Sequence, residues 1–267
     1  MKYLGVDACS SGWVAGILDD GALGVARYDD IETLWAAHSD AERLLIDIPI
    51  GLPETGRRAC DKAAKELLGD RRSCVFYTPA GAVLDAEDYA DANERNREQT
   101  GHGLSKQTYN ILPAIAAVRD FLASHETAHR RVVECHPELC FAAFAGGTPV
   151  PDSKHTDAGL ATRRELLRNE LDDADAAYEA ALDEYYRKDV GRDDVLDALA
   201  LTAAAREDAL LSVPEGRDHR TQWETIAYPE SRQFGGATPD GGSRVRSLPR
   251  QPPVLARSGR GHHAFAV

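Results

Sequence analysis

Three aspartates interrupt apolar stretches in which a carboxylate is energetically unfavourable. Asp47 lies within the run LLIDIPI (44–50), Asp7 ends the short apolar run that begins at residue 3, and Asp197 lies within the apolar stretch 195–201. A buried carboxylate is costly unless another group compensates its charge. Three such acids in three segments expected to form the core point to one metal site. Carboxylate oxygens suit hard divalent cations, so the expected ion is Mg²⁺ or Mn²⁺.

Asp194 extends this set. It precedes Asp197 by three residues, so on a helix both side chains would share one face. Together with Asp7 and Asp47, the pair would supply the metal ligands and the catalytic acids of a phosphodiester hydrolase. Such an enzyme activates a water and stabilises the leaving oxygen with divalent cations about 4 Å apart. Glu134, at the end of a short apolar run, could be a further ligand, a general base or the partner of an arginine.

Each acid also has a structural interpretation. Asp7 could cap a turn, and Asp47 could accept hydrogen bonds from backbone amides beside the prolines that follow it. Acids at a helix start cap free amides and favour the helix dipole. Capping is the better interpretation for Asp193, whereas for Asp194 the two roles are equally supported; Asp197 lies one turn inside the helix, where capping explains it poorly.

Basic residues between 57 and 154 are candidate contacts for a phosphate-bearing substrate. Arginine suits bidentate phosphate binding, and the alternative is ion pairing with the many local acids. The expected substrate-binding residues are Arg57, Arg58, Arg72, Lys106, Gln107 and Lys154. His136 and Glu138 are weaker candidates, and neither a phosphate-binding glycine loop nor a Ser/His/Asp arrangement is recognisable.

The composition is acidic and lysine-poor. The 267 residues carry a net charge of −13, with 26 Asp and 18 Glu against 25 Arg and 6 Lys. This is typical of a protein in concentrated salt, although a merely acidic protein is the alternative. At molar salt, charges are screened within about 3 Å, so acidity does not exclude a nucleic-acid substrate. Five cysteines without a CxxC pair argue against a disulfide framework, and no long apolar run or leader is recognisable, so a cytoplasmic location without membrane contact is expected.

The pattern of apolar residues gives the order of the expected elements. Three strands at 3–8, 12–18 and 23–28 form an antiparallel meander, and a helix follows at about 31–38. A strand buried on both faces is expected at 43–48. A mostly helical insertion would occupy about 54–130, followed by a strand at 131–135, one or two charged amphipathic helices at 160–188 and an apolar helix at 193–211. Residues 231–267 hold six Arg and one acid and are rich in Gly, Pro and Ser, which predicts a disordered tail; residues 1–230 would form one domain.

This layout of three antiparallel strands followed by alternating helices and strands is that of the ribonuclease H-like fold. The expected fold class is therefore α/β: a ribonuclease H-like mixed five-stranded sheet flanked by helices, with a helical insertion between the fourth and fifth strands. Up to about residue 228 the sequence also resembles the domain of unknown function 429 family, described as predicted ribonuclease H-like nucleases. The resemblance is carried by GVDACSSGW (5–13), IDIPIGLP (46–53), RRACD (57–61), RRSCVF (71–76), LSKQ (104–107), ECHPELCF (134–141) and DDVLDAL (193–199). The last of these is also similar to the closing helix of RuvC-type junction resolvases.

These observations lead to one main function and two alternatives. The main expectation is a divalent-metal-dependent nuclease with nucleic acid as substrate. A non-catalytic binding module with the same fold is the first alternative. A phosphotransferase of the actin and sugar-kinase type is less favoured, since it needs two copies of the fold and the chain shows no internal repeat. A homodimer is a weak expectation.

Overall fold

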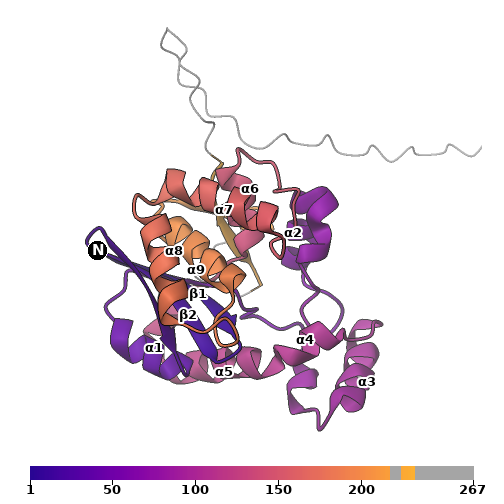
Figure 1. Cartoon of the computed structure of the whole chain (residues 1–267). Coiled ribbons are helices and arrows are strands. Elements are labelled where there is room, and N and C mark those ends of the chain that lie inside the picture. Colours follow the sequence, from indigo (N-terminus) through magenta and orange to yellow (C-terminus); the bar gives the residue numbers. More distant parts are fainter. Residues whose placement is uncertain (217–223, 232–267) are drawn as a thin grey trace, which may run out of the picture. The chain divides into compact units, whose positions relative to one another are not determined.

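A five-stranded mixed sheet forms the centre of the protein (Figure 1). The computed structural model describes residues 1–216 and 224–231. The sheet has the order β3-β2-β1-β4-β5, in which β1 pairs antiparallel with β2 and parallel with β4, and β4 pairs parallel with β5. Its strands are β1 (Lys2–Cys9), β2 (Gly12–Asp19), β3 (Ala22–Tyr28), β4 (Arg43–Ile46) and β5 (Val132–Glu134). The prediction of an α/β fold with a mixed five-stranded sheet is confirmed.

The leading meander is set by its turns. Between β2 and β3, Asp20 and Gly21 both have positive φ angles, 47° and 92°. This is the conformation of a type I′ turn, whose twist matches that of a two-stranded hairpin. The turn pairs Asp19 with Ala22 and so fixes the register of the two strands.

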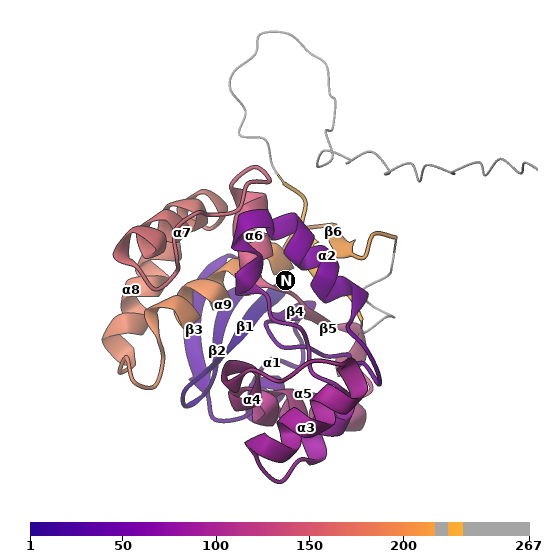
Figure 2. The same ribbon diagram turned by 90° about the vertical axis from the view of Figure 1, so that its right-hand side faces the viewer.

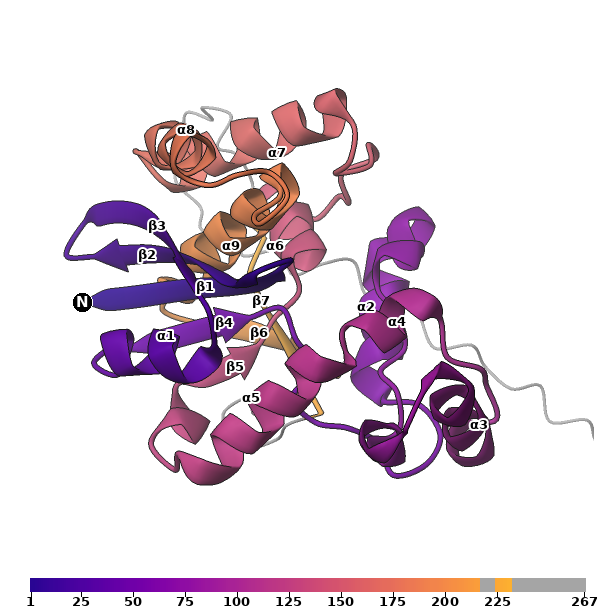
Figure 3. The same ribbon diagram turned by 60° about the horizontal axis from the view of Figure 1, so that its bottom comes forward.

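Helices cover both faces of the sheet (Figures 2 and 3). Their bounds are α1 (Ile31–His38), α2 (Ala59–Leu68), α3 (Tyr89–Thr100), α4 (Lys106–Asn110), α5 (Leu112–Ser124), α6 (Pro137–Phe144), α7 (Asp157–Glu170), α8 (Ala174–Glu184) and α9 (Arg192–Ala205), with 3₁₀ turns at Gly69–Cys74, Gly81–Asp85 and Ala128–Arg130. In Figure 3, α1 and α5 lie on one face, whereas α6 to α9 lie on the other. The segment between β4 and β5 contains α2 to α5.

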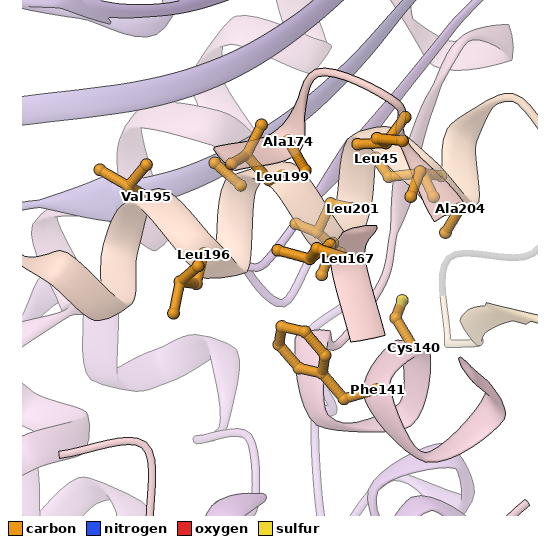
Figure 4. Packing of buried hydrophobic residues seen from close by; sticks show 14 of the residues in the cluster. Leu45, Cys140, Phe141, Leu167, Ala174, Val195, Leu196, Leu199, Leu201 and Ala204 are labelled. Carbon is orange, nitrogen blue, oxygen red and sulfur yellow. The ribbon is translucent and has the colours of Figure 1, made fainter. Parts of the chain in front are cut away.

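Strand β4 contributes to two separate cores, one on each face. Leu44 and Ile46 pack in the core with α1 and α5, while Leu45 packs in the core with α6 to α9. All three side chains are fully buried, which explains why β4 is apolar without alternation. Figure 4 shows Leu45 in the second core beside residues of α6 and α9.

Helix α9 approaches the sheet closely because two paired glycines offer no side chain. Gly5 of β1 lies opposite Gly16 of β2. A Cβ atom on Gly5 would lie 2.2 Å from the Ala198 carbonyl oxygen, and one on Gly16 would lie 2.3 Å from Oγ1 of Thr202. Real side chains do not tolerate such distances, so these glycines set the distance of α9 from β1.

Two predicted boundaries are wrong. Strand β4 ends at Ile46 rather than residue 48, although Asp47 still donates its backbone N–H to the Val6 carbonyl at 3.0 Å. Helix α9 ends at Ala205 rather than residue 211, because residues 210–213 form strand β6 (Leu210–Val213), which pairs antiparallel with β7 (Ile226–Pro229). In an apolar run as short as residues 210–213, the spacing of apolar residues does not distinguish a strand from the continuation of a helix.

Two further expectations concern the chain ends and the membrane. The predicted disordered tail lies, apart from residue 231, outside the described residues. Within 1–216 and 224–231, no helix has both the length and the apolar character that crossing a membrane requires.

Candidate active site

The sheet and helix α9 bring together three of the predicted acids. Val6 of β1 is paired with Ile46 of β4, so the next residues of these parallel strands, Asp7 and Asp47, lie side by side. Asp197 faces the same end of β1 from α9, whose position is set by the glycine contact. Asp7 and Asp197 are 7% and 1% exposed, whereas Asp47 is half-buried. We call Asp7, Asp47 and Asp197 the acid cluster.

The acids of the cluster perturb one another. Burial is the main cause that raises the pKa of Asp7 well above its usual value, and the charges of Asp47 and Asp197 add to it. Burial and then the charge of Asp197 raise the pKa of Asp47 to about 7. Desolvation and like charges both disfavour the ionised carboxylate, so the cluster is poised to gain a cation or a proton.

Lys154 provides a cation to the cluster from the loop between α6 and α7. Its Nζ donates to Oδ2 of Asp197 at 2.5 Å and lies 3.7 Å from Oδ2 of Asp193. Burial alone would lower the pKa of Lys154, but attraction to Asp197 and Asp7 outweighs it and raises the pKa above its usual value. Lys154 was predicted to bind substrate; in the structure its ammonium group neutralises part of the acid cluster.

One oxygen of the cluster has no partner among the described residues. Oδ1 of Asp197 is buried and accepts no hydrogen bond from residues 1–216 or 224–231, although Oδ2 of the same carboxylate binds Lys154. A buried acceptor without a partner costs about 1–3 kcal/mol. This oxygen is a vacant acceptor position within a set of carboxylates.

The two remaining acids, Asp193 and Asp194, lie in the first turn of α9 and make different contacts. Asp194 accepts the backbone N–H of Gly191 at 2.8 Å and so closes the helix start. Asp193, for which capping was the favoured role, faces Lys154 and lies 3.3 Å from Nδ1 of His155. The pKa of Asp194 is raised mainly by burial, and the bond from Gly191 opposes the rise. Asp194 is therefore a structural cap at the edge of the cluster.

Glu134 belongs to a buried ion network next to the cluster. Its carboxylate receives two bonds from the Arg58 guanidinium, at 2.6 and 2.8 Å, and one from the Ile50 amide at 2.8 Å. Arg58 also binds Asp61 at 2.6 Å, and it is 3% exposed. The arginine-paired alternative for Glu134 is thus the one observed. The charges of Glu134 and Arg58 are therefore already compensated within the protein.

A second buried pair was not predicted as a unit. Arg163 of α7 is fully buried and binds the Glu138 carboxylate with Nη2 at 2.7 and 2.8 Å. Nδ1 of His136 accepts the Glu138 backbone N–H at 3.2 Å and caps α6, and burial lowers the pKa of this histidine. An arginine in a charged amphipathic helix gives no sequence signal of such burial.

The other predicted substrate contacts lie on the insertion. Arg57, Arg72, Lys106 and Gln107 are exposed. The Arg57 guanidinium lies 3.7 Å from the centre of the Tyr77 ring, and Lys106 Nζ lies 4.6 Å from the centre of the Tyr89 ring. These residues are separate from the acid cluster and remain available to a ligand.

The donor atoms of the acid cluster fit a hard divalent cation. The donors are carboxylate oxygens, one of them without a partner, and their raised pKa values reflect uncompensated charge. In the described part of the chain, however, no three His, Cys, Asp or Glu side chains already converge closely enough to hold a metal ion. Binding of a cation would therefore require side-chain movements that bring these carboxylates together.

Comparison with known proteins identifies the family alone. Neither the curated proteins nor the solved structures give a match. One family model matches residues 5–219, a range that contains the acid cluster and Lys154. The chain therefore belongs to the family described as protein of unknown function (DUF429).

Proposed function

We propose that this protein is a divalent-metal-dependent phosphodiesterase acting on nucleic acid, with Asp7, Asp47 and Asp197 as its metal-binding and catalytic acids. The observation that carries the proposal is the meeting of these carboxylates, from β1, the residue after β4 and α9, around one lysine. Buried structural acids are normally compensated by a cation, as Glu138 is by Arg163. The acid cluster instead holds more negative charge than its single cation neutralises.

The topology supports the same proposal by analogy. The strand order β3-β2-β1-β4-β5, with an antiparallel meander followed by two parallel strands, is similar to that of ribonuclease H-like nucleases. Helix α9 lies over β1 as the closing helix does in the resolvases that the sequence resembles. A fold hosts many functions, so the acids rather than the topology carry the argument.

Mg²⁺ or Mn²⁺, once bound, would lower the pKa of a bound water and stabilise the leaving oxygen of the phosphodiester. The chain itself would orient the acids through the rigid contact of α9 with β1. Asp47, with a pKa of about 7, is partly protonated near neutrality. Binding of a cation should therefore release protons and become tighter as the pH rises.

The alternative is a binding module in which Lys154 permanently takes the place of a metal. The 2.5 Å contact between Lys154 and Asp197 specifically favours it, because a lysine held this way already stabilises one acid. In that case the protein would bind nucleic acid without turnover.

The test is a turnover assay with labelled single-stranded, duplex, hybrid and junction substrates in concentrated KCl, with Mg²⁺, Mn²⁺ or EDTA. Wild type is compared with Asp47→Asn and with Asp40→Asn, which changes an exposed acid paired with Lys2. The proposal expects metal-dependent cleavage by wild type and Asp40→Asn and loss of at least about 100-fold in Asp47→Asn. If no substrate is cleaved and calorimetry shows no heat of Mn²⁺ binding, the phosphodiesterase proposal is rejected in favour of the binding module.

A further inference from the structure

A cavity of about 170 Å³ lies within the helical insertion, near the small cavity beside Asp47. The loop residues 76–78 form one wall, and the end of α3 with the loop leading to α4 forms the other. We call it the insertion pocket and define it by Arg57, Phe76, Tyr77, Asn96, His102 and Leu104. Figure 3 shows α2, α3 and α4 beyond the ends at which β1 and β4 finish.

Two stacked cation–aromatic pairs flank the insertion pocket. Arg57 lies over the ring of Tyr77, and Lys106, next to the lining residue Ser105, lies over the ring of Tyr89. Tyr89 is fixed by a hydrogen bond from its hydroxyl to the Leu104 carbonyl at 2.8 Å. A guanidinium on an aromatic ring is a flat, positively charged surface, on which nucleobases stack.

The cations of these pairs are free of carboxylates. Among residues 1–216 and 224–231, no ion pair with an acid involves Arg57 or Lys106, whereas Arg58, Arg163 and Arg164 are all paired. Both side chains are exposed and lie at one cavity, so their charges are available to an anionic ligand.

The polar groups of the walls are largely committed to the protein. Asn96 accepts the Ala80 backbone N–H at 3.0 Å and donates to the His102 carbonyl at 2.9 Å. Thr78 binds Asp61 through both its amide and its hydroxyl. The walls are therefore rigid and offer few free groups to read the edge of a base, so recognition would rest on stacking and charge, which tolerate any base.

The insertion pocket adjoins the acid cluster. Phe76 and Thr78 line both it and the small cavity of about 20 Å³ whose other residues include Asp47 and His136. Phe76 and Thr78 therefore form a wall that the two cavities share. A strand with one residue in the insertion pocket could continue toward Asp47 on the other side of this wall.

We propose that the insertion pocket binds one unpaired nucleotide of the substrate strand, with its base stacked on the Arg57–Tyr77 pair and its phosphates near the charges of Arg57 and Lys106. The inference rests on the proposed function and deepens it, because a base within a duplex cannot enter the pocket. The substrate class is therefore single-stranded nucleic acid or a strand with an unpaired residue.

The test measures binding apart from turnover. Fluorescence anisotropy follows a labelled single-stranded oligonucleotide and a blunt duplex of the same sequence, in EDTA over a series of KCl concentrations. The variants are Tyr77→Ala, Tyr77→Phe and Arg57→Ala. The matched controls are Tyr186→Ala, at a tyrosine that is 77% exposed, and Arg119→Ala, at an exposed arginine of α5.

Wild type should bind the single strand more tightly than the duplex. Tyr77→Ala should weaken single-strand binding by about 5- to 150-fold, since base–aromatic stacking has that magnitude, and should remove the preference over duplex. Tyr77→Phe keeps the ring and should bind as wild type does. Arg57→Ala should reduce the slope of log K against log salt by about 0.7 for one lost phosphate contact; both controls should be neutral.

Three results would overturn the inference: no wild-type binding of either oligonucleotide, equal affinity for single strand and duplex, or Tyr77→Ala and Arg57→Ala within twofold of wild type. Circular dichroism of each variant separates a lost contact from a lost fold. Single-strand binding that depends on Tyr77 without any cleavage would reject the nuclease and keep the pocket. If wild type and Tyr77→Ala cleave the substrate equally well, the nuclease proposal stands and the inference about the pocket is rejected.

Discussion

Asp47→Asn is expected to stabilise the folded protein at neutral and alkaline pH while it abolishes the proposed activity. The wild-type carboxylate is kept near its neighbours Asp197 and Asp7 at a cost, which appears as a pKa raised from 3.8 to about 7. At about 1.4 kcal/mol per pKa unit, the full shift corresponds to about 4 kcal/mol above pH 7. Asp47 is half-buried, so solvent screening makes this value an upper limit. Asparagine has nearly the same shape as aspartate and carries no charge, so the substitution removes this cost.

The sign of the effect follows from proton binding. Between about pH 4 and pH 7 the folded state holds a proton on Asp47 that the unfolded chain has already released, so the wild-type free energy of unfolding falls as pH rises. Below about pH 4 both states are protonated and the penalty vanishes. The free energy of unfolding of Asp47→Asn should therefore equal that of wild type at about pH 4. Its excess over wild type should grow between about pH 4 and pH 7 and level off above pH 7.

The measurement is urea-induced unfolding followed by circular dichroism at several values between about pH 4 and pH 8, at constant KCl and with EDTA. Asp40→Asn is the control: a hydrogen bond from Lys2 lowers the pKa of Asp40, so its loss should change stability slightly and in the opposite direction. If Asp47→Asn is no more stable than wild type at about pH 8, or if its advantage does not shrink toward pH 4, the reasoning about the acid cluster is refuted.

Three further substitutions test the contacts that build the site, each by thermal or urea unfolding. Lys154→Met leaves a buried carboxylate without its cation and should lose about 3–5 kcal/mol at about pH 8 in EDTA, with part of the loss recovered in Mn²⁺; equal losses with and without metal would contradict a cation site. Gly5→Ala places a Cβ 2.2 Å from α9 backbone atoms and should cost about 1–3 kcal/mol or more, whereas Gly24→Ala, with no atom within 4 Å, should be tolerated. Arg58→Met should cost about 3–5 kcal/mol and Arg57→Met almost nothing; similar values would argue against the buried network.

The acid cluster could be predicted because each of its members disrupts a pattern. Asp7, Asp47 and Asp197 are charged residues in segments whose other residues are apolar, and the core needs those segments. The parallel pairing of β1 with β4 then follows from the order of the elements. Lys154 was recognised only as one basic residue among several, because a loop carries no periodicity that would place it.

The pairing of buried charges could not be predicted. Glu134 and Arg58 are 76 positions apart in the sequence, and which acid an arginine meets depends on the tertiary arrangement rather than on local pattern. For a similar reason the predicted cap, Asp193, faces Lys154 instead, and Asp194, for which the two roles were equally supported, is the residue that caps the helix. A shift of one residue in the helix start, set by Gly191, decides which carboxylate reaches the free amide and which faces Lys154.

The parts of the site differ in how firmly the fold holds them. Asp7 and Asp197 are fixed through the contact of α9 with Gly5, and that contact belongs to the core, so these acids cannot separate without loss of packing. Lys154 is carried by the irregular segment between α6 and α7 and is held by its ion pair. A cation that enters the cluster would therefore displace Lys154 rather than spread the acids. Hydrogen exchange in residues 151–156, with and without Mn²⁺, should show the change in that loop and none in α9.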